Sequence, residues 1–587
     1  MSKKMVFFVG LILLSFVSSG FCWTQSFRSN ASGGLFWGDF DNDLDPIFIF
    51  DNEGYRLYSS FSNLSSSGDR FFSNGSDGIY LFGISGFNGL PRPYRWESRT
   101  AFIIQLADTR SDAASGLDTN YDGVIDIAGD GFMAGDFTQI IDVNDDNIYD
   151  TRVNIASTGD NFDLLKRRDW QITHSYKIGS STMGLVFSHF GYGNNASENN
   201  RSSGLLNYVV PLQSFSYTQN LTQIDLATSD VVDQIRETGD FLTTYQTPSN
   251  VLEIAVEFPF GPINNSELRL DFSYNNSKNE YKVSDLFDYY RDVSSGGIVG
   301  INSQTESIEV DSSLSGSLIS PGVLLTKHWN SDNYSWFRVS VGFGSYDADM
   351  TISDNYDVEN IFTGPTGNLE TVSRDYDDLT LRKGETERKR ISFFHKTNVK
   401  FTQNLSFAIG LGYLRNSDDT DWRQDYTLSH VFSYDNGDNV QDHSDSVSLV
   451  TESARIDLSN ETISNNVNLP VAIEYALGKW TFRLGAIHQI VRVSEEENRR
   501  IVESQPRRTT TTYGDGEVVI EVEDDEFLSR RTATETRSHH NEFIYGLEFK
   551  ANKNLKAELL GFLNDGTTGF LDTEFYRDLR LSITILF

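Results

Sequence analysis

Cysteine is nearly absent from this chain of 587 residues, because Cys22 is the only one. A single cysteine excludes a disulfide framework and a zinc site built from several thiolates. Proline is also scarce, with 11 residues, which suits long sheets because proline breaks the hydrogen-bond ladder. Basic residues are outnumbered, with 48 Lys and Arg against 83 Asp and Glu. The net charge of −35 leaves no basic surface for nucleic acid, which we exclude as a partner.

Long apolar runs are missing too, except near the N-terminus. Lys3 and Lys4 precede an apolar stretch over 5–17, and small residues follow at 18–20. This order predicts a signal peptide over residues 1–22. The stretch is shorter than the ~20 residues of a membrane-spanning helix. Phe21 stands before Cys22 where a lipoprotein would have a small residue, so we do not expect lipidation.

The chain is rich in aromatic residues, at 13%, and apolar residues alternate with polar ones in many segments. The last segment has apolar residues at period two, with polar residues between them: Leu579, Leu581, Ile583, Ile585 and Phe587 against Arg580, Ser582 and Thr584. Alternation of this kind places one type of side chain on each face of a β-strand. An edge strand of a soluble sandwich is the alternative interpretation of this segment taken alone.

The same alternation recurs upstream, for example over 268–274, 337–343, 405–413, 467–475 and 543–549. The polar faces of several of these segments carry Glu, Arg, Asp or Asn, which pack into a dry interior only at a large desolvation cost. We therefore expect the apolar faces to meet lipid and the charged faces to line a wet lumen.

Sixteen strands are predicted, at 55–63, 78–87, 94–107, 168–178, 181–194, 249–260, 265–279, 318–328, 334–348, 388–402, 404–416, 463–476, 479–493, 537–550, 554–564 and 576–587. Their connections alternate between short turns and long polar loops such as 280–317, 349–387, 417–462 and 494–536. This alternation is typical of membrane barrels with periplasmic turns and extracellular loops. The expected fold is all-β, a transmembrane antiparallel β-barrel over 55–587, with residues 23–54 as a periplasmic or plug segment.

The terminal phenylalanine resembles the C-terminal signal of Gram-negative outer-membrane β-barrels, and the whole pattern is porin-like. The resemblance implies the outer membrane as location, with its lipid and the barrel-assembly machinery as partners. The first strands are the weakest predictions. Without 55–63 and 78–87 the barrel would have 14 strands and a plug, which resembles the fatty-acid transporter type.

The predicted extracellular loop over 108–167 is strongly acidic, with 13 Asp between Asp108 and Asp163. Oxygen-bearing residues recur at alternate positions in two runs, which resemble calcium loops of the EF-hand type: Asp118, Asn120, Asp122 and Asp126, then Asp142, Asn144, Asp146 and Asp150. Both runs are candidate Ca²⁺ sites, and an acidic solvated loop is the alternative. Asp39, Asp41, Asp43 and Asp45 form another alternating run, for which we favour a turn or plug contacts over calcium.

The favoured function is a porin-like channel for passive diffusion of small hydrophilic solutes, with a preference for cations because of its acidic lining. One alternative is a plugged, substrate-specific barrel, and another is a surface adhesion or structural barrel with calcium-stiffened loops. No G-x-S-x-G or H-E-x-x-H motif occurs, so we do not expect an enzyme. The oligomeric state stays open, with a homotrimer as one alternative.

Overall fold

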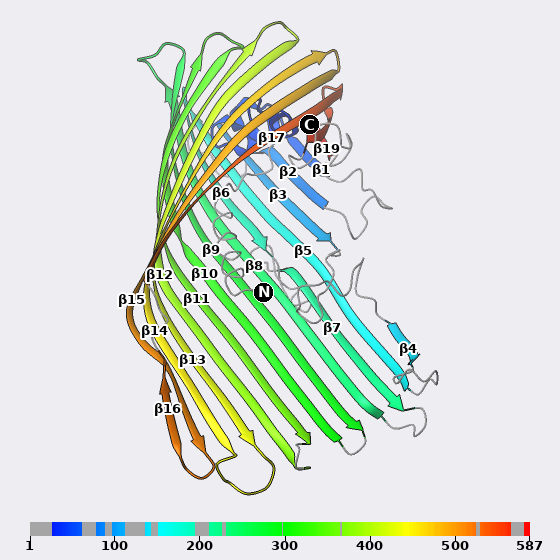
Figure 1. The fold of residues 1–587 in the computed structure, drawn as a ribbon. Helices are drawn as coiled ribbons and strands as arrows, with labels where there is room; N and C mark the ends of the chain where they lie inside the picture. The colour runs from blue at the N-terminus through cyan, green and yellow to red at the C-terminus, as the bar shows by residue number, and fades with distance from the viewer. Residues whose placement is uncertain are drawn as a thin grey trace.

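The computed structural model describes residues 26–61, 78–87, 97–111, 135–141, 151–193, 210–225, 231–295, 298–363, 367–523, 529–564 and 580–587. Strands dominate this part of the chain and form one sheet (Figure 1). Sixteen of its strands pair antiparallel with two neighbours each round a ring: β1 (Arg56–Phe61), β2 (Gly78–Phe87), β3 (Glu97–Ser111), β5 (Thr151–Ile178), β6 (Ser181–Gly193), β8 (Val231–Pro259), β9 (Ser266–Ser295), β10 (Ile298–His328), β11 (Tyr334–Thr363), β12 (Leu369–Lys400), β13 (Leu405–Asp435), β14 (Ser446–Leu477), β15 (Trp480–Tyr513), β17 (Arg530–Asn552), β18 (Leu555–Asn564) and β19 (Arg580–Leu586).

The ring closes where the first strand meets the last. β1 pairs with β19 from Arg56↔Leu586 to Phe61↔Leu581, and on its other side with β2. The predicted all-β barrel of 16 antiparallel strands is confirmed. Because β1 and β2 belong to the wall, the alternative of 14 strands is wrong. Three further strands extend the sheet outside the ring: β4 (Gly135–Ile141), β7 (Val210–Asp225) and β16 (Val518–Val522).

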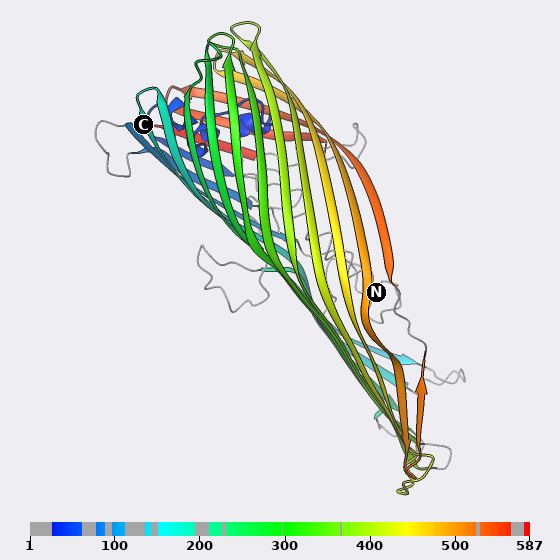
Figure 2. The ribbon, with the colours of Figure 1, turned by 90° about the vertical axis from the view of Figure 1, so that its left-hand side faces the viewer.

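The strands are much longer than a membrane requires, and this corrects the predicted long loops. Segments 280–317, 349–387, 417–462 and 494–536 are largely strand, and β15 alone has 34 residues. At ~3.3 Å per residue that is roughly 110 Å, against a hydrocarbon core of about 30 Å. The acidic segment 108–167 likewise contains the end of β3, β4 and the start of β5. Figures 1 and 2 show this tall wall.

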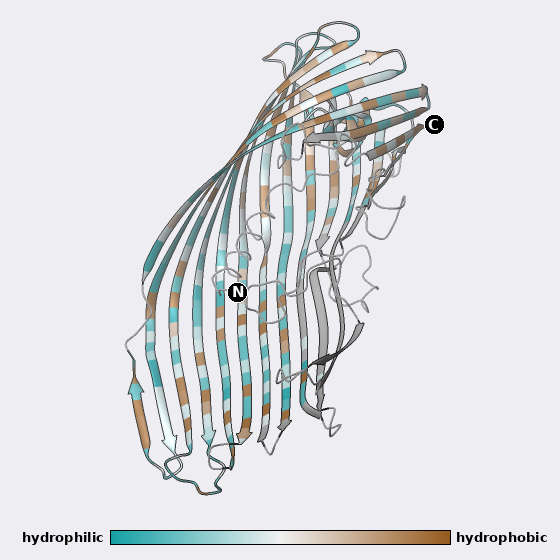
Figure 3. Cartoon of the chain, turned by 45° about the vertical axis from the view of Figure 1, so that its right-hand side comes forward, coloured by the Kyte–Doolittle hydropathy of each residue, from teal (hydrophilic) through white to brown (hydrophobic). Residues whose placement is uncertain are grey.

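The two faces of the wall have inverted polarity near one end of the ring. On β9, Leu270 and Phe272 are 47% and 44% exposed, whereas Arg269 and Asp271, which alternate with them, are 2% and 7% exposed. Figure 3 shows the resulting bands of hydrophobic and hydrophilic residues along the strands. The outward apolar face predicted from the alternation is therefore present. A wall that is apolar outside and polar inside is typical of barrels in lipid.

Six short connections lie at this same end, at 179–180, 260–265, 329–333, 401–404, 478–479 and 553–554. The C-terminal Phe587 is there too, and we call this the short-turn end and the opposite one the far end (Figure 1). Three short helical elements precede β1: α2 (Phe27–Asn30), α3 (Asp39–Leu44) and the 3-10 helix η1 (Phe48–Asp51). They lie within the ring at the short-turn end (Figures 1 and 2).

Among the described residues, no helix has the length and apolarity that crossing a membrane would need.

Candidate functional site

Residues 26–54, which we call the inner segment, form a compact unit held by its own side chains. Ser26 caps α2 through its hydroxyl, which accepts from the backbone N–H of Ser29 at 3.0 Å. The Asp41 carboxylate of α3 accepts from the backbone N–H of Ser26 at 2.8 Å and of Gly38 at 2.7 Å. These bonds satisfy backbone groups that helix starts leave free. They also tie the start of α2 to the start of α3.

An aromatic cluster anchors the inner segment to the wall. Phe48 stacks on Trp336 of β11 with ring centroids 5.1 Å apart, and Trp37 meets the same indole edge-on at 4.8 Å. Ala255 of β8, Leu324 of β10 and Ile47 complete a buried apolar cluster. Aromatic pairs in these geometries add about 0.5–1.5 kcal/mol each beyond the burial of their area. The contact therefore combines apolar burial with a defined orientation.

A buried guanidinium on β9 holds the middle of the inner segment. Arg269 donates to Asp45 at 2.6 and 2.9 Å and to Glu253 of β8 at 2.7 Å. Its Nε lies 3.3 Å from Asp271, which also receives a hydrogen bond from Arg338 at 2.9 Å. Asp45 is the member of this cluster that belongs to the inner segment; the others belong to the wall.

A second buried guanidinium stands on β15. Arg483 donates to Glu474 at 2.7 Å, Glu548 at 2.5 Å and Glu558 at 3.1 Å, on β14, β17 and β18. Arg28 of the inner segment binds the same Glu474 with two hydrogen bonds, of 2.8 and 2.9 Å. Paired guanidinium–carboxylate contacts of this kind are short and directional. They fix the position of α2 against the wall.

Lys396 of β12 is fully buried and contacts the inner segment. Among the described residues, no carboxylate accepts a hydrogen bond from it. Its ammonium donates to the carbonyl oxygen of Leu35 at 3.2 Å. It also lies 3.5 Å from the ring centroid of Trp336 and 5.0 Å from that of Trp37. Cation–π contacts of desolvated cations are worth about 2 kcal/mol or more. Asn398 donates to the same Leu35 oxygen at 3.2 Å, so this turn of the inner segment is held twice.

The four aspartates of the run over 39–45 point to different partners. Asp43 is buried and accepts from Tyr58 at 2.7 Å, Ser85 at 2.5 Å and Asn52 at 2.8 Å. Asp39 lies 3.8 Å from Arg56 and 3.9 Å from Lys556. Asp41 and Asp45 have the contacts given above. The carboxylates hold the inner segment in place, as the contact interpretation of this run expects.

Contacts of this kind extend round the ring. Besides the strands already named, the inner segment meets β3 at Arg99, β5 at Gln171 and Ser175, β6 at Gly184, β13 at Ala408, and β17 and β18 at Ile544 and Leu560. The polar inner face was expected to line a wet lumen. At the short-turn end the inner segment lies against this face, and its Asp45 and Arg28 join the ion pairs of the wall.

Toward the far end the inner face of the wall carries aromatic residues and arginines. Tyr356, Tyr376 and His430 are direct cross-strand neighbours on β11, β12 and β13, with centroids 5.4 and 4.3 Å apart. Tyr376 and Lys396 lie an even number of residues apart on β12, so their side chains point to the same, inner face. Tyr356 and His430 share that face because they pair directly with Tyr376. Arg382 lies on the same face of β12. This row could not be predicted from the sequence, because polar and apolar residues are mixed on both faces of the wall here.

The eight candidate calcium ligands, Asp118, Asn120, Asp122, Asp126, Asp142, Asn144, Asp146 and Asp150, lie outside the described residues, as does the predicted signal peptide. Whether the two acidic runs bind Ca²⁺ stays a prediction.

The fold and the inner segment define a class: a barrel of 16 strands with inverted polarity that holds its own residues 26–54 within the ring at the short-turn end. No protein-family model matches the chain, and no curated protein matches it either. Solved structures that it resembles include the FrpB iron transporter from Neisseria meningitidis, with 10% identity, a TM-score of 0.24, and 91% of this chain and 81% of that chain covered.

The ferric-catecholate import receptor Fiu from E. coli matches at 9% identity with a TM-score of 0.22, over 92% of this chain and 82% of that chain. The ferric enterobactin receptor PfeA from Pseudomonas aeruginosa matches at 10% identity with a TM-score of 0.23, over 91% and 80%. Likeness at this level carries no argument about function, so the conclusions below rest on the chain's own residues.

Proposed function

We propose that this chain is an outer-membrane transport barrel that its inner segment gates, so that hydrophilic solutes pass only when the segment moves. The observation that carries the proposal is the seating of residues 26–54 across the short-turn end, on strands from β1 round to β18. The outward apolar face beside this end supports a place in lipid. The polar inner face, with its Ser, Asn and charged residues, suits hydrophilic cargo.

A passive porin with a permanently open lumen is disfavoured, because it requires an open short-turn end. Buried ion pairs at Arg269 and Arg483 and the aromatic cluster at Trp336 would all lie in the path of the solute. The cation preference inferred from the acidic composition applies to the open state. In that state carboxylates around the mouth would attract cations.

The test is conductance in planar lipid bilayers. We compare the full chain with a variant that lacks residues 26–54 but keeps residues 1–25 for export. The expected result is a closed full-length protein and stepwise, cation-preferring conductance for the deletion. Equal steady conductance of the two proteins would overturn the proposal that the inner segment is a gate. Circular dichroism checks that each variant is a folded barrel.

A second variant covers the case in which the deletion does not fold. Gly485→Ala keeps every residue of the inner segment, but its added Cβ would stand 3.2 Å from the Cα of Ser32 and 3.1 Å from the carbonyl carbon of Ala31. Such distances force the neighbouring backbone to shift. Openings more frequent than in the unaltered protein are expected, and unchanged closure would count against the gate.

A further inference from the structure

Two connections meet at the far end of the barrel, well away from the inner segment. One joins β13 to β14 over 436–445, and the other is the tight turn between β15 and β16 over 514–517. The backbone N–H of Gly514 donates to the carbonyl oxygen of Asp445 at 3.0 Å, and Ser446 pairs with Tyr513 in the sheet. The two connections are therefore fixed against each other by backbone bonds.

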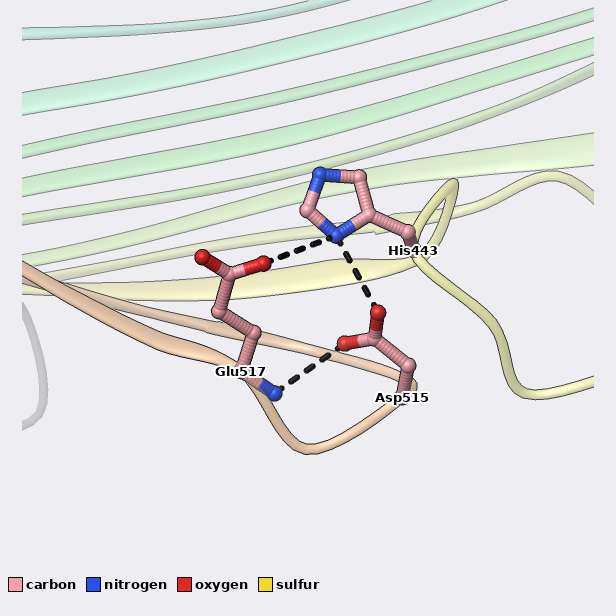
Figure 4. A group of neighbouring side chains, drawn as sticks. All are labelled: His443, Asp515 and Glu517. Atoms are coloured by element: carbon pink, nitrogen blue, oxygen red, sulfur yellow. Dashed lines mark hydrogen bonds and ion pairs between the residues drawn. The ribbon is translucent and has the colours of Figure 1, made fainter.

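Three possible metal ligands converge where these connections touch (Figure 4). The Nδ1 atom of His443 lies 3.3 Å from Oδ2 of Asp515 and 3.5 Å from Oε2 of Glu517. All three ligand atoms lie within 4.8 Å of one another. Among the described residues, this is the group of His, Cys, Asp and Glu side chains with metal-binding geometry.

The distances from His443 to the two carboxylates fit a shared metal ion better than direct hydrogen bonds. Good N–H···O hydrogen bonds measure about 2.7–3.2 Å, and both contacts of the His443 ring are longer. Around a tetrahedral Zn²⁺ with ligands at about 2.0–2.2 Å, neighbouring ligand atoms stand roughly 3.3–3.6 Å apart. The imidazole therefore already has the spacing to both carboxylates that a shared ion would set.

Two of the three ligands, His443 and Asp515, are also held in orientation by a second group. The His443 ring stacks on Tyr513 with centroids 4.1 Å apart and an angle of 20°. Asp515 uses its other oxygen, Oδ1, to accept from the backbone N–H of Glu517 at 3.0 Å, which turns Oδ2 toward the histidine. Gly516, at φ +90°, makes the turn that brings both carboxylates to one side. Such outer contacts orient ligands in metal sites.

We propose that His443, Asp515 and Glu517 form a site for a divalent transition-metal ion of the Zn²⁺ type, with water in the remaining position. One imidazole and two carboxylates suit Zn²⁺, whereas Ca²⁺ takes six to eight oxygen ligands. The net charge of −35 draws cations toward the surface. The ion clips the β15–β16 hairpin to the connection between β13 and β14.

The test is isothermal titration calorimetry. The untagged full-length protein in detergent is first dialysed against a chelator and is then titrated with ZnCl₂. We expect His443→Ala and Asp515→Asn each to weaken Zn²⁺ binding at this site by at least about tenfold. Two matched controls should leave it unchanged: Asp438→Asn, in the same connection, and His328→Ala, beside Glu267 at the short-turn end.

Co²⁺ gives a second readout, because its visible absorption bands report tetrahedral coordination by the three side chains. The bands are expected in the unaltered protein and absent in His443→Ala. Binding that survives His443→Ala, or that Asp438→Asn weakens as much as Asp515→Asn does, would overturn the proposal. Failure to bind Zn²⁺ or Co²⁺ at all would also overturn it, leaving an exposed contact between a histidine and two carboxylates.

Discussion

Gly184 of β6 offers a direct way to unseat the inner segment without altering any residue in it. The glycine faces the inner segment between Ser175 of β5 and Ala255 of β8 in the sheet. A Cβ built at this position would stand 2.5 Å from the Cβ of Pro46 and 2.7 Å from the Ser175 hydroxyl. We therefore expect Gly184→Ala to push Pro46 away from the wall.

The size of the effect follows from these distances. Ordinary contact begins at 3.4 Å, so Pro46 must move by at least about 0.9 Å, because its Cβ stands at 2.5 Å and its carbonyl oxygen lies closer still. Overpacking of this kind costs roughly 1–3 kcal/mol. The move also disturbs the hydrogen bond from the Ser175 hydroxyl to the Pro46 carbonyl oxygen, worth about 1 kcal/mol. A total of about 2–4 kcal/mol corresponds to a roughly 30- to 700-fold shift away from the seated state.

The assay combines bilayer conductance with hydrogen exchange of the backbone amides over 26–54. Gly184→Ala should open more often and exchange faster in this segment, while the wall strands keep their protection. Gly412→Ala is the matched control on the inner face of β13, because its Cβ would meet Asn468 at an ordinary 3.4 Å. Equal behaviour of the two variants would refute the idea that close packing against the wall holds the gate.

Other substitutions distinguish residues that stabilise the wall from residues that hold the inner segment in place. Arg483→Gln leaves three carboxylates without their shared cation and should destabilise the barrel by about 3–5 kcal/mol in thermal unfolding. The exposed Arg492→Gln is the control and should leave thermal unfolding nearly unchanged. Asp45→Asn should raise conductance while leaving the melting temperature of the barrel nearly unchanged, whereas Arg269→Gln should lower that temperature. Trp336→Ala should speed hydrogen exchange over 26–54, because removing a buried indole costs about 3–5 kcal/mol. Unchanged exchange would show that the aromatic cluster does not hold the segment.

The wall was predictable where its two faces meet different surroundings. Phe337, Val339, Val341 and Phe343 alternate with polar or small residues on β11, because this stretch turns an apolar face outward and a different face into the ring. Further along the same strand, over 349–363, both faces carry polar residues and the period disappears. The strand continues there because its neighbours continue, and that information lies in β10 and β12 rather than in the segment itself.

The seat of the inner segment was only partly predictable, for a related reason. A run of alternating aspartates indicates contacts but not partners, and Asp45 meets Arg269 across 224 positions of the chain. Arg28 meets Glu474 across 446 positions. Such pairs depend on the closure of the ring and on the register of every strand between them. The group of His443, Asp515 and Glu517 could not be predicted for the same reason, because its members come from two separate connections.

The proposed gate requires the inner segment to leave its position, and the charges of the wall are arranged so that this leaves most of them paired. Without Asp45, Arg269 and Arg338 still face Glu253 and Asp271, two cations against two anions.

Without Arg28, the cluster on the other side holds Arg483, Lys550 and Lys556 against Glu474, Glu548 and Glu558, three against three. Withdrawal of the inner segment therefore leaves no unpaired charge in either cluster. An unpaired buried charge is what makes breaking a buried ion pair costly. Lys396 and Arg56 are the exceptions, because the Leu35 carbonyl that accepts from Lys396 and the Asp39 carboxylate beside Arg56 both leave with the segment. Water entering the vacated space would hydrate both cations. The cost of opening is then set mainly by the apolar and aromatic contacts around Trp336 rather than by the buried charges.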